Sequence, residues 1–170
     1  MDDLQITTHD VLPPEAAAVD DGIGRYNDGA APLHEVKPLA CIARLPDGRV
    51  AGGAVGRRWG PCCELQQLWV DDGARRRGVG TRLMRAFEAL AAERGCRSVF
   101  LETYDFQAPD FYRRLGYWSE HVRGGYPHGI VRYDMVRHLE PAAGIPIVEG
   151  PVPGCIGRIT QLHAAYYARH

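Results

Sequence analysis

Three arginines and two glycines lie between a predicted strand and the start of a predicted helix. The apolar residues 64–70 come first, and Arg75-Arg76-Arg77-Gly78-Val79-Gly80, here named the basic turn, follow where a helical pattern begins. Backbone amides at the start of a helix have no intrahelical partner, and the helix dipole favours negative charge there. Glycine lacks the Cβ atom that would hold a phosphate away, and guanidinium groups bind phosphate through forked donors. The basic turn is therefore predicted to bind a pyrophosphate.

The spacing of these glycines does not fit two common nucleotide motifs. A Walker loop ends in Gly-Lys-Ser or Gly-Lys-Thr, and no lysine follows Gly80. A dinucleotide fingerprint needs a glycine three positions after Gly80, where this chain has Leu83. An ordinary basic surface turn is the alternative to a pyrophosphate site. The surrounding segments are needed to distinguish these two interpretations.

A second motif, F-Q-A-P-D-F-Y-R-R-L-G-Y, occupies residues 106–117. Pro109 suits the first turn of a short helix, and Gly116 suits its end. The combination of R-x-x-G-x-G after a strand and F-Y-x-x-L-G-Y about thirty residues later resembles the GNAT superfamily of acetyl-CoA-dependent N-acetyltransferases. Within it, the chain is most similar to a bacterial subgroup that carries F-Q-A-P-x-F-Y-x-x-L-G-Y.

This resemblance implies acetyl-CoA as the cofactor and a primary amine of a small molecule or peptide as the acceptor. The tyrosine that matches Tyr112 sits beside the coenzyme's sulfur in that family. Many relatives have an asparagine shortly after the strand that carries Thr103, whereas the polar group in this chain is Gln107, which leaves the role of Gln107 open. The implied cofactor-binding residues are Leu68, Trp69, Val70, Arg75, Arg76, Arg77, Gly78, Val79, Gly80, Thr81, Gln107 and Phe111.

Candidate catalytic groups follow from the chemistry of acyl transfer. The reaction needs a neutral amine, a polarised thioester carbonyl and a proton for the leaving thiolate. Tyr112 can supply that proton, because a phenol with a pKa of roughly 10 is a fair match to a thiol near 8.5. Glu64 and Glu102, each on a predicted strand among apolar residues, are candidates for the base. The alternatives are a core aromatic for Tyr112 and a solvent-facing or arginine-paired carboxylate for Glu102.

The surrounding pattern predicts an α/β (α+β) fold with a mixed, mostly antiparallel sheet and helices on both faces. Strands are predicted at residues 5–12, 38–45, 50–57, 64–70, 98–104, 117–122 and 130–137. Helices are predicted at residues 15–26, from the basic turn to Gly95, and within residues 106–117. In the second helix the apolar residues recur at helical spacing, and Glu88 falls among the polar positions.

The strand before the basic turn has an irregular apolar pattern. Leu65 has one parity, whereas Leu68 and Val70 have the other, so strict alternation would separate them onto opposite faces. A β-bulge between Leu65 and Leu68 would restore one apolar face and splay this strand from its neighbour. GNAT proteins have such a splay, through which the pantetheine arm enters. A strand buried on both faces is the alternative.

Length, charge and cysteine content limit the other function classes. The chain has 170 residues, a formal net charge of −1, and five cysteines without a C-x-x-C pair. We therefore expect no nucleic-acid partner, no membrane partner and no metal site. The chain has no signal-like start, which predicts a cytoplasmic protein. Residues 1–140 are predicted to form the GNAT domain, 141–154 a Pro/Gly-rich linker, and 155–170 a C-terminal helix.

Three questions stay open at this point. The C-terminal helix resembles the opening of a second, truncated GNAT domain, but a tail docked on the domain or on a homodimer partner fits equally. A non-catalytic acyl-CoA-binding module, or half of a tandem protein, is the alternative to an active transferase. The acceptor is not identified, and the residues expected to frame its pocket are Tyr26, Asn27, His34, Glu35, Tyr126 and His128.

Overall fold

The computed structural model describes residues 4–139 of the chain. Within them the helices are α1 (Ala16–Ala30), α2 (Val79–Glu93) and α3 (Pro109–Arg114). The strands are β1 (Lys37–Arg44), β2 (Val50–Trp59), β3 (Cys62–Val70), β4 (Ser98–Tyr104), β5 (Trp118–Arg123) and β6 (Arg132–His138). Short 3-10 turns are η1 (Leu33–Glu35), η2 (Asp72–Ala74) and η3 (Pro127–Gly129). The predicted linker at 141–154 and helix at 155–170 lie outside the described residues.

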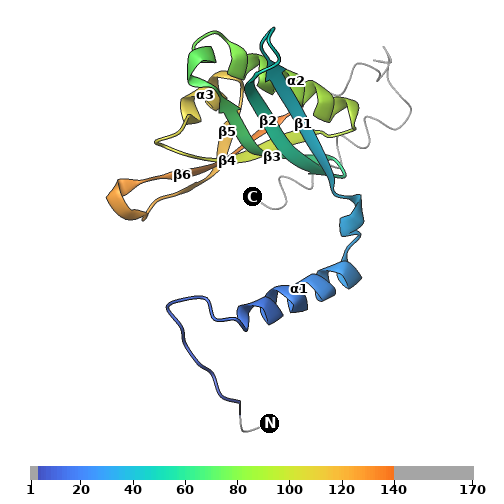
Figure 1. Cartoon of the computed structure of the whole chain (residues 1–170), viewed down its shortest axis with the longest axis vertical. Coiled ribbons are helices and arrows are strands. Elements are labelled where there is room, and N and C mark those ends of the chain that lie inside the picture. Colours follow the sequence, from blue (N-terminus) through green and yellow to red (C-terminus); the bar gives the residue numbers. More distant parts are fainter. Residues whose placement is uncertain (1–3, 140–170) are drawn as a thin grey trace, which may run out of the picture. The chain divides into compact units, whose positions relative to one another are not determined.

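The strands form a single mixed sheet in the order β1-β2-β3-β4-β6-β5 (Figure 1). Only the β3–β4 pair is parallel, and every other neighbouring pair is antiparallel. The β3–β4 crossover contains the basic turn and α2, as a parallel connection requires. The mixed, mostly antiparallel α/β fold predicted from the sequence is confirmed.

The β-bulge predicted in β3 is also confirmed. Val55 of β2 pairs with Gln67, but the next residue, Gly56, pairs with Leu65, so Gln66 is the extra residue. On the other side of β3, pairing with β4 ends at Leu65 and Leu101. Beyond that point the two parallel strands separate, and residues 66–70 keep only β2 as a sheet neighbour.

The core lies on the side of the sheet that α2 covers. Leu83, Met84, Phe87 and Ala91 of α2 are buried, which matches the predicted helical spacing. They belong to the same apolar cluster as buried residues of the strands and of the α3 region, including Leu65, Leu101, Met135, Tyr112, Leu115 and Tyr117. This shared cluster ties α3 and the strands to the helix that follows the basic turn.

The predicted strand at residues 5–12 is wrong. This segment has no strand, and its apolar side chains, such as Ile6 and Val11, are 81% exposed. Alternating residues form a strand only beside a partner edge, and sequence alternation does not reveal whether one exists. The first helix is longer than predicted, because it continues through Asn27-Asp28-Gly29 to Ala30. None of the residues of α1 is buried.

No helix within residues 4–139 combines the length and the apolar character that a membrane crossing requires.

We expect Gly56→Ala to destabilise the protein strongly. A Cβ at Gly56 would collide with the carbonyl oxygen of Glu64 and lie 2.9 Å from the Phe87 ring, in a region where neither neighbour is free to move. Overpacking of this kind should lower the free energy of unfolding by about 3 kcal/mol, measured by urea denaturation. Gly53→Ala is the matched control, because its Cβ would meet the movable end of the Ile42 side chain at 2.9 Å and the Cys41 carbonyl oxygen only at an ordinary contact distance of 3.5 Å. Equal losses in the two variants would contradict this explanation.

Candidate active site

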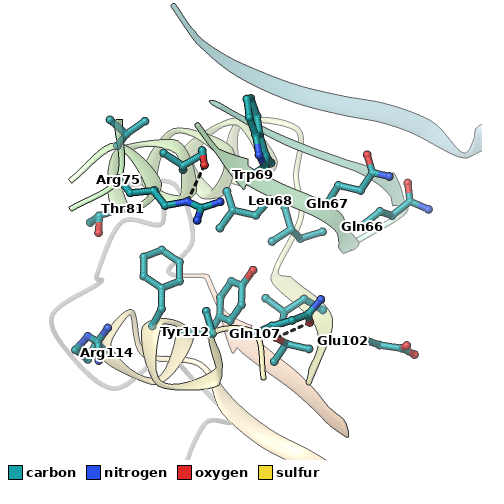
Figure 2. Close-up of a pocket in the computed structure, with 18 of the residues that line it drawn as sticks. Gln66, Gln67, Leu68, Trp69, Arg75, Thr81, Glu102, Gln107, Tyr112 and Arg114 are labelled. Atoms are coloured by element: carbon teal, nitrogen blue, oxygen red, sulfur yellow. Dashed lines mark hydrogen bonds between the residues drawn. The ribbon is translucent and has the colours of Figure 1, made fainter. Parts of the chain in front are cut away.

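A groove of about 1030 Å³ runs between β3, the start of α2 and α3 (Figure 2). It opens where β3 and β4 stop pairing, so the splay of the sheet forms it. All the predicted cofactor-binding residues except Arg77 line this groove, together with Tyr112 and Glu102. Residues from two motifs about thirty positions apart in the sequence thus share one cavity.

One end of the groove is formed by the basic turn and the first turn of α2. Gly78 precedes α2 in the left-handed region, with φ of 75°, and no side chain caps the helix. The first amide of α2 that bonds back within the helix is that of Arg82, which donates to the Gly78 carbonyl at 3.0 Å. The preceding amides at the helix start therefore face the groove end without a helical partner. This is the geometry of an anion site.

The arginines of the basic turn do not share one role. Arg75 donates from Nε to the Val70 carbonyl at 3.0 Å and forms an ion pair with Asp72 at 2.8 Å, so it braces the turn. Arg76 lies in the left-handed region, with φ of 58°, and lines the groove. Arg77 instead lines a second, smaller pocket between β1 and α2. The sequence placed all three together, and the structure separates Arg77 from the other two.

Arg114 also reaches this end of the groove, and the sequence analysis missed it. It follows Tyr112 by two positions in the second motif and lines the groove on the wall opposite Arg75 (Figure 2). The pair of arginines after Tyr112 was the available signal. The other groove-lining residues that the sequence did not predict as site residues are Leu65, Gln66, Gln67, Leu101, Thr103, Phe106 and Ala108.

Tyr112 occupies the middle of the groove. It lies on α3 with only 8% of its surface exposed, and its hydroxyl points into the groove (Figure 2). Burial raises the pKa of Tyr112 to about 12, because the charged phenolate would lose its hydration. Its ring makes edge contacts with Phe111 and Tyr117, with centroids 5.2 and 5.8 Å away. The side chain is thus both a core aromatic and a groove-facing hydroxyl.

Tyr117 links this region to a buried ion pair between α2 and β6. Glu88 of α2 is buried, and its Oε2 accepts a hydrogen bond from Arg137 of β6 at 2.6 Å. Burial, reinforced by the Glu88 carboxylate, raises the pKa of Tyr117. Glu88 is buried although the helical pattern placed it among the polar positions, and it pairs with Arg137 as well as with Arg85 of its own helix, at 3.4 Å.

Gln107 is fixed in orientation by two donors. Its Oε1 accepts from the Thr103 hydroxyl at 3.1 Å and from the backbone amide of Tyr104 at 2.9 Å. A backbone amide can only donate, so the side-chain oxygen has to face it. The amide nitrogen of Gln107 is then left to donate to whatever occupies the groove.

The two candidate bases differ in position. Glu102 lines the groove, at the end away from Arg75 and Arg114, and accepts from Arg132 at 3.2 Å (Figure 2). Glu64 is not part of the groove wall, and its carboxylate pairs with Arg57 at 2.5 Å. Pairing with an arginine, which the sequence left open for Glu102, therefore occurs at both residues. Within residues 4–139 no three His, Cys, Asp or Glu side chains are grouped to hold a metal ion.

The six residues predicted to frame an acceptor pocket do not all lie in one place. Tyr26 and Asn27 lie on α1, His34 and Glu35 lie in η1, and none of these four lines the groove. Tyr126 lies just before η3, which contains His128, and its ring meets the edge of Tyr104 at 5.9 Å. The loop between β5 and β6 is thereby brought to the strand that carries Glu102.

Both the sequence and the fold of this chain are similar to those of acetyltransferases. A model of the Acetyltransferase (GNAT) family matches residues 9–117. Blasticidin-S acetyltransferase of Streptomyces morookaense is 42% identical over 111 residues, covering 65% of this chain and 79% of that protein. An acetyltransferase structure from Bacillus cereus has a TM-score of 0.66 at 25% identity, covering 79% of this chain and 98% of that one. A Bacillus anthracis acetyltransferase solved with acetyl coenzyme A shares the fold, with a TM-score of 0.54 at 22% identity, covering 60% of this chain and 62% of that one.

Proposed function

The chain belongs to the GNAT family of acetyltransferases, and we propose that it transfers the acetyl group of acetyl-CoA to a primary amine. The acceptor is a small molecule or a peptide, and it attacks the thioester directly while both substrates are bound. One observation carries the proposal: a single groove joins the uncapped start of α2 to the Tyr112 hydroxyl and continues to Glu102.

The groove wall fits the chemical groups of acetyl-CoA in order. Amides at the start of α2, with Arg76 and Arg114, would hold the pyrophosphate. The edge of β3 over residues 66–70 has no strand on the β4 side, so its backbone groups are available to the amides of the pantetheine arm. The free amide nitrogen of Gln107 adds a donor near Tyr112.

Bound acetyl-CoA would supply a thioester whose C–S bond breaks as the amine nitrogen bonds to the carbonyl carbon. In this reaction the nitrogen loses a proton and the sulfur gains one. Tyr112 donates its hydroxyl hydrogen toward the sulfur, because its hydroxyl points into the groove where the arm would end. Glu102 takes the amine proton, since it is the candidate base in the groove wall, whereas Glu64 is paired with Arg57 outside it.

The first test is a search for amine-dependent release of the coenzyme's thiol from acetyl-CoA. Blasticidin S belongs in the first panel because a curated relative is named for its acetylation, alongside simple primary amines and peptide amines. Turnover with at least one amine is expected, with the N-acetyl product identified by mass spectrometry. Tight coenzyme binding without turnover of any amine would instead favour a non-catalytic acyl-CoA-binding module.

We expect Gly80→Asp to weaken the binding of acetyl-CoA by roughly tenfold or more, measured by calorimetry. The substitution places a negative charge at the start of α2, where the pyrophosphate is proposed to bind. The fold should tolerate the side chain, because a Cβ at Gly80 would only contact Phe111 at 3.5 Å and Val70 at 3.7 Å. Gly80→Asn is the matched control of equal size and no charge. Similar dissociation constants for the two variants would mean that no phosphate lies there.

We expect Tyr112→Phe to lower kcat by roughly 10²-fold or more, the usual scale of general acid catalysis, without weakening coenzyme binding. Tyr117→Phe is the matched control, because this neighbouring tyrosine does not line the groove. The raised pKa, about 12, keeps the Tyr112 phenol protonated, so kcat should not decline between pH 8 and about pH 10. An alkaline decline near pH 10 that disappears in Tyr112→Phe, or equal kcat values in the wild type and this variant, would contradict the assignment.

A further inference from the structure

An exposed aromatic ring lies in the groove wall just after β4, the strand that carries Glu102 at one end of the groove. Phe106 lines the groove, yet 65% of its surface is exposed. One face of its ring stacks on Tyr104, with centroids 5.3 Å apart and an angle of 15° between the planes. Tyr104 is itself supported by the edge of Tyr126. We name these three residues the aromatic stack.

The backbone that carries Phe106 is held on both sides. The Phe106 amide donates to the Asp105 carboxylate at 2.9 Å, and the Asp105 amide donates to the Val131 carbonyl at 2.9 Å. The Gln107 amide donates to the Tyr104 carbonyl at 2.9 Å. A single exposed aromatic residue on a protein surface needs no explanation. Phe106 differs because a fixed turn and a stacked neighbour hold its ring in the wall of a groove.

The charge at this end of the groove favours a cation. The Arg132 guanidinium lies between two carboxylates, with Glu102 at 3.2 Å and Asp134 at 3.2 Å. Two negative groups and one positive group leave this cluster with one negative charge. The Glu102 side chain is 60% exposed, and its only hydrogen bond within residues 4–139 reaches Oε2. The other carboxylate oxygen, Oε1, is free to bind an ammonium group.

We propose that the acceptor is a cationic amine carried on a planar, conjugated ring system. The ring would lie against the outer face of Phe106, and the ammonium group would meet Glu102. It would release one proton to solvent there, so that the neutral amine attacks and loses its second proton in the step described above. This inference rests on the proposed function, and it narrows the acceptor class within it. Aliphatic amines would use only the carboxylate, and anionic acceptors would be repelled by the net negative charge.

The test uses two amines of matched skeleton, 2-phenylethylamine and 2-cyclohexylethylamine. Both carry a primary ammonium two carbons from a six-membered ring, but only the first ring is planar. The kcat/KM ratio of the phenyl to the cyclohexyl compound should be roughly five to ten, the scale of one aromatic stacking contact. The ratio should fall to about one in Phe106→Ala and be retained in Phe106→Tyr.

Two further variants distinguish ring binding by Phe106 from a general loss of structure. Phe100→Ala removes an equally large ring from the same strand region, but Phe100 does not line the groove, so the ratio should not change. Glu102→Gln should lower kcat/KM for both amines and leave their ratio unaltered. A ratio near one in the wild type, or one that Phe106→Ala does not alter, would overturn the inference while leaving the transferase function intact.

Calorimetry of the two amines with the coenzyme A complex separates the inference from the proposed function. A preference for 2-phenylethylamine that depends on Phe106, without turnover of any amine in the panel, would support the aromatic stack as a binding site and refute the transferase function. Turnover of both amines, with equal affinities for the two, would support the transferase function and overturn the inference about the aromatic stack. Failure of both amines to bind or react, in a protein that turns over another primary amine, would overturn the inference alone.

Discussion

The loss of pairing between β3 and β4 is the constraint on which the site depends. These parallel strands bond only as far as Leu65 and Leu101, and residues 66–70 then keep one sheet neighbour instead of two. Backbone groups on the open side need water or a ligand as partner, since an unpaired peptide group removed from water is costly. The groove is the space left by this separation. The basic turn lies at one end because β3 leads directly into it, and Glu102 lies at the other because β4 continues past the last pair.

Small residues in β2 make that separation compatible with a packed core. The extra residue Gln66 bends β3, and Gly56 pairs with Leu65 at that point, where a Cβ would collide with the Glu64 carbonyl oxygen. Four residues earlier, a Cβ at Gly52 would lie 2.7 Å from the Trp69 carbonyl oxygen. Phe87 and Leu83 of α2 approach these two glycines closely. The close approach of α2 brings its N-terminus to the edge of β3, so the same glycines that admit the bulge also position the anion site.

Local patterns in the sequence predicted most of this arrangement. The strands from β1 onward and the helix after the basic turn follow from periodicity and glycine positions, and parity alone predicted the bulge. Several of the failures depend on distant partners. Residues 5–12 alternate like a strand but pair with none, and Glu88 is buried because Arg137, on another element, supplies its counter-charge. Likewise, sequence treated Glu64 and Glu102 alike, but only Glu102 lines the groove, and the direction taken by Arg77 depends on packing between α2 and β1.

Tyr112 combines two demands that oppose each other. Packing against Phe111 and Tyr117 fixes its ring in the groove, but the same burial raises its pKa to about 12. A thiol has a pKa of roughly 8.5, below the pKa of about 12 of this phenol, so complete proton transfer from the phenol to a free thiolate would be strongly uphill. Tyr112 is therefore better suited to share its hydrogen with the sulfur as the C–S bond breaks than to protonate a departed thiolate. In the proposed reaction the amine releases a proton during the same event. Because Glu102 takes that proton, the phenol does not regain its hydrogen from the amine, and exchange with solvent restores both side chains after the products leave.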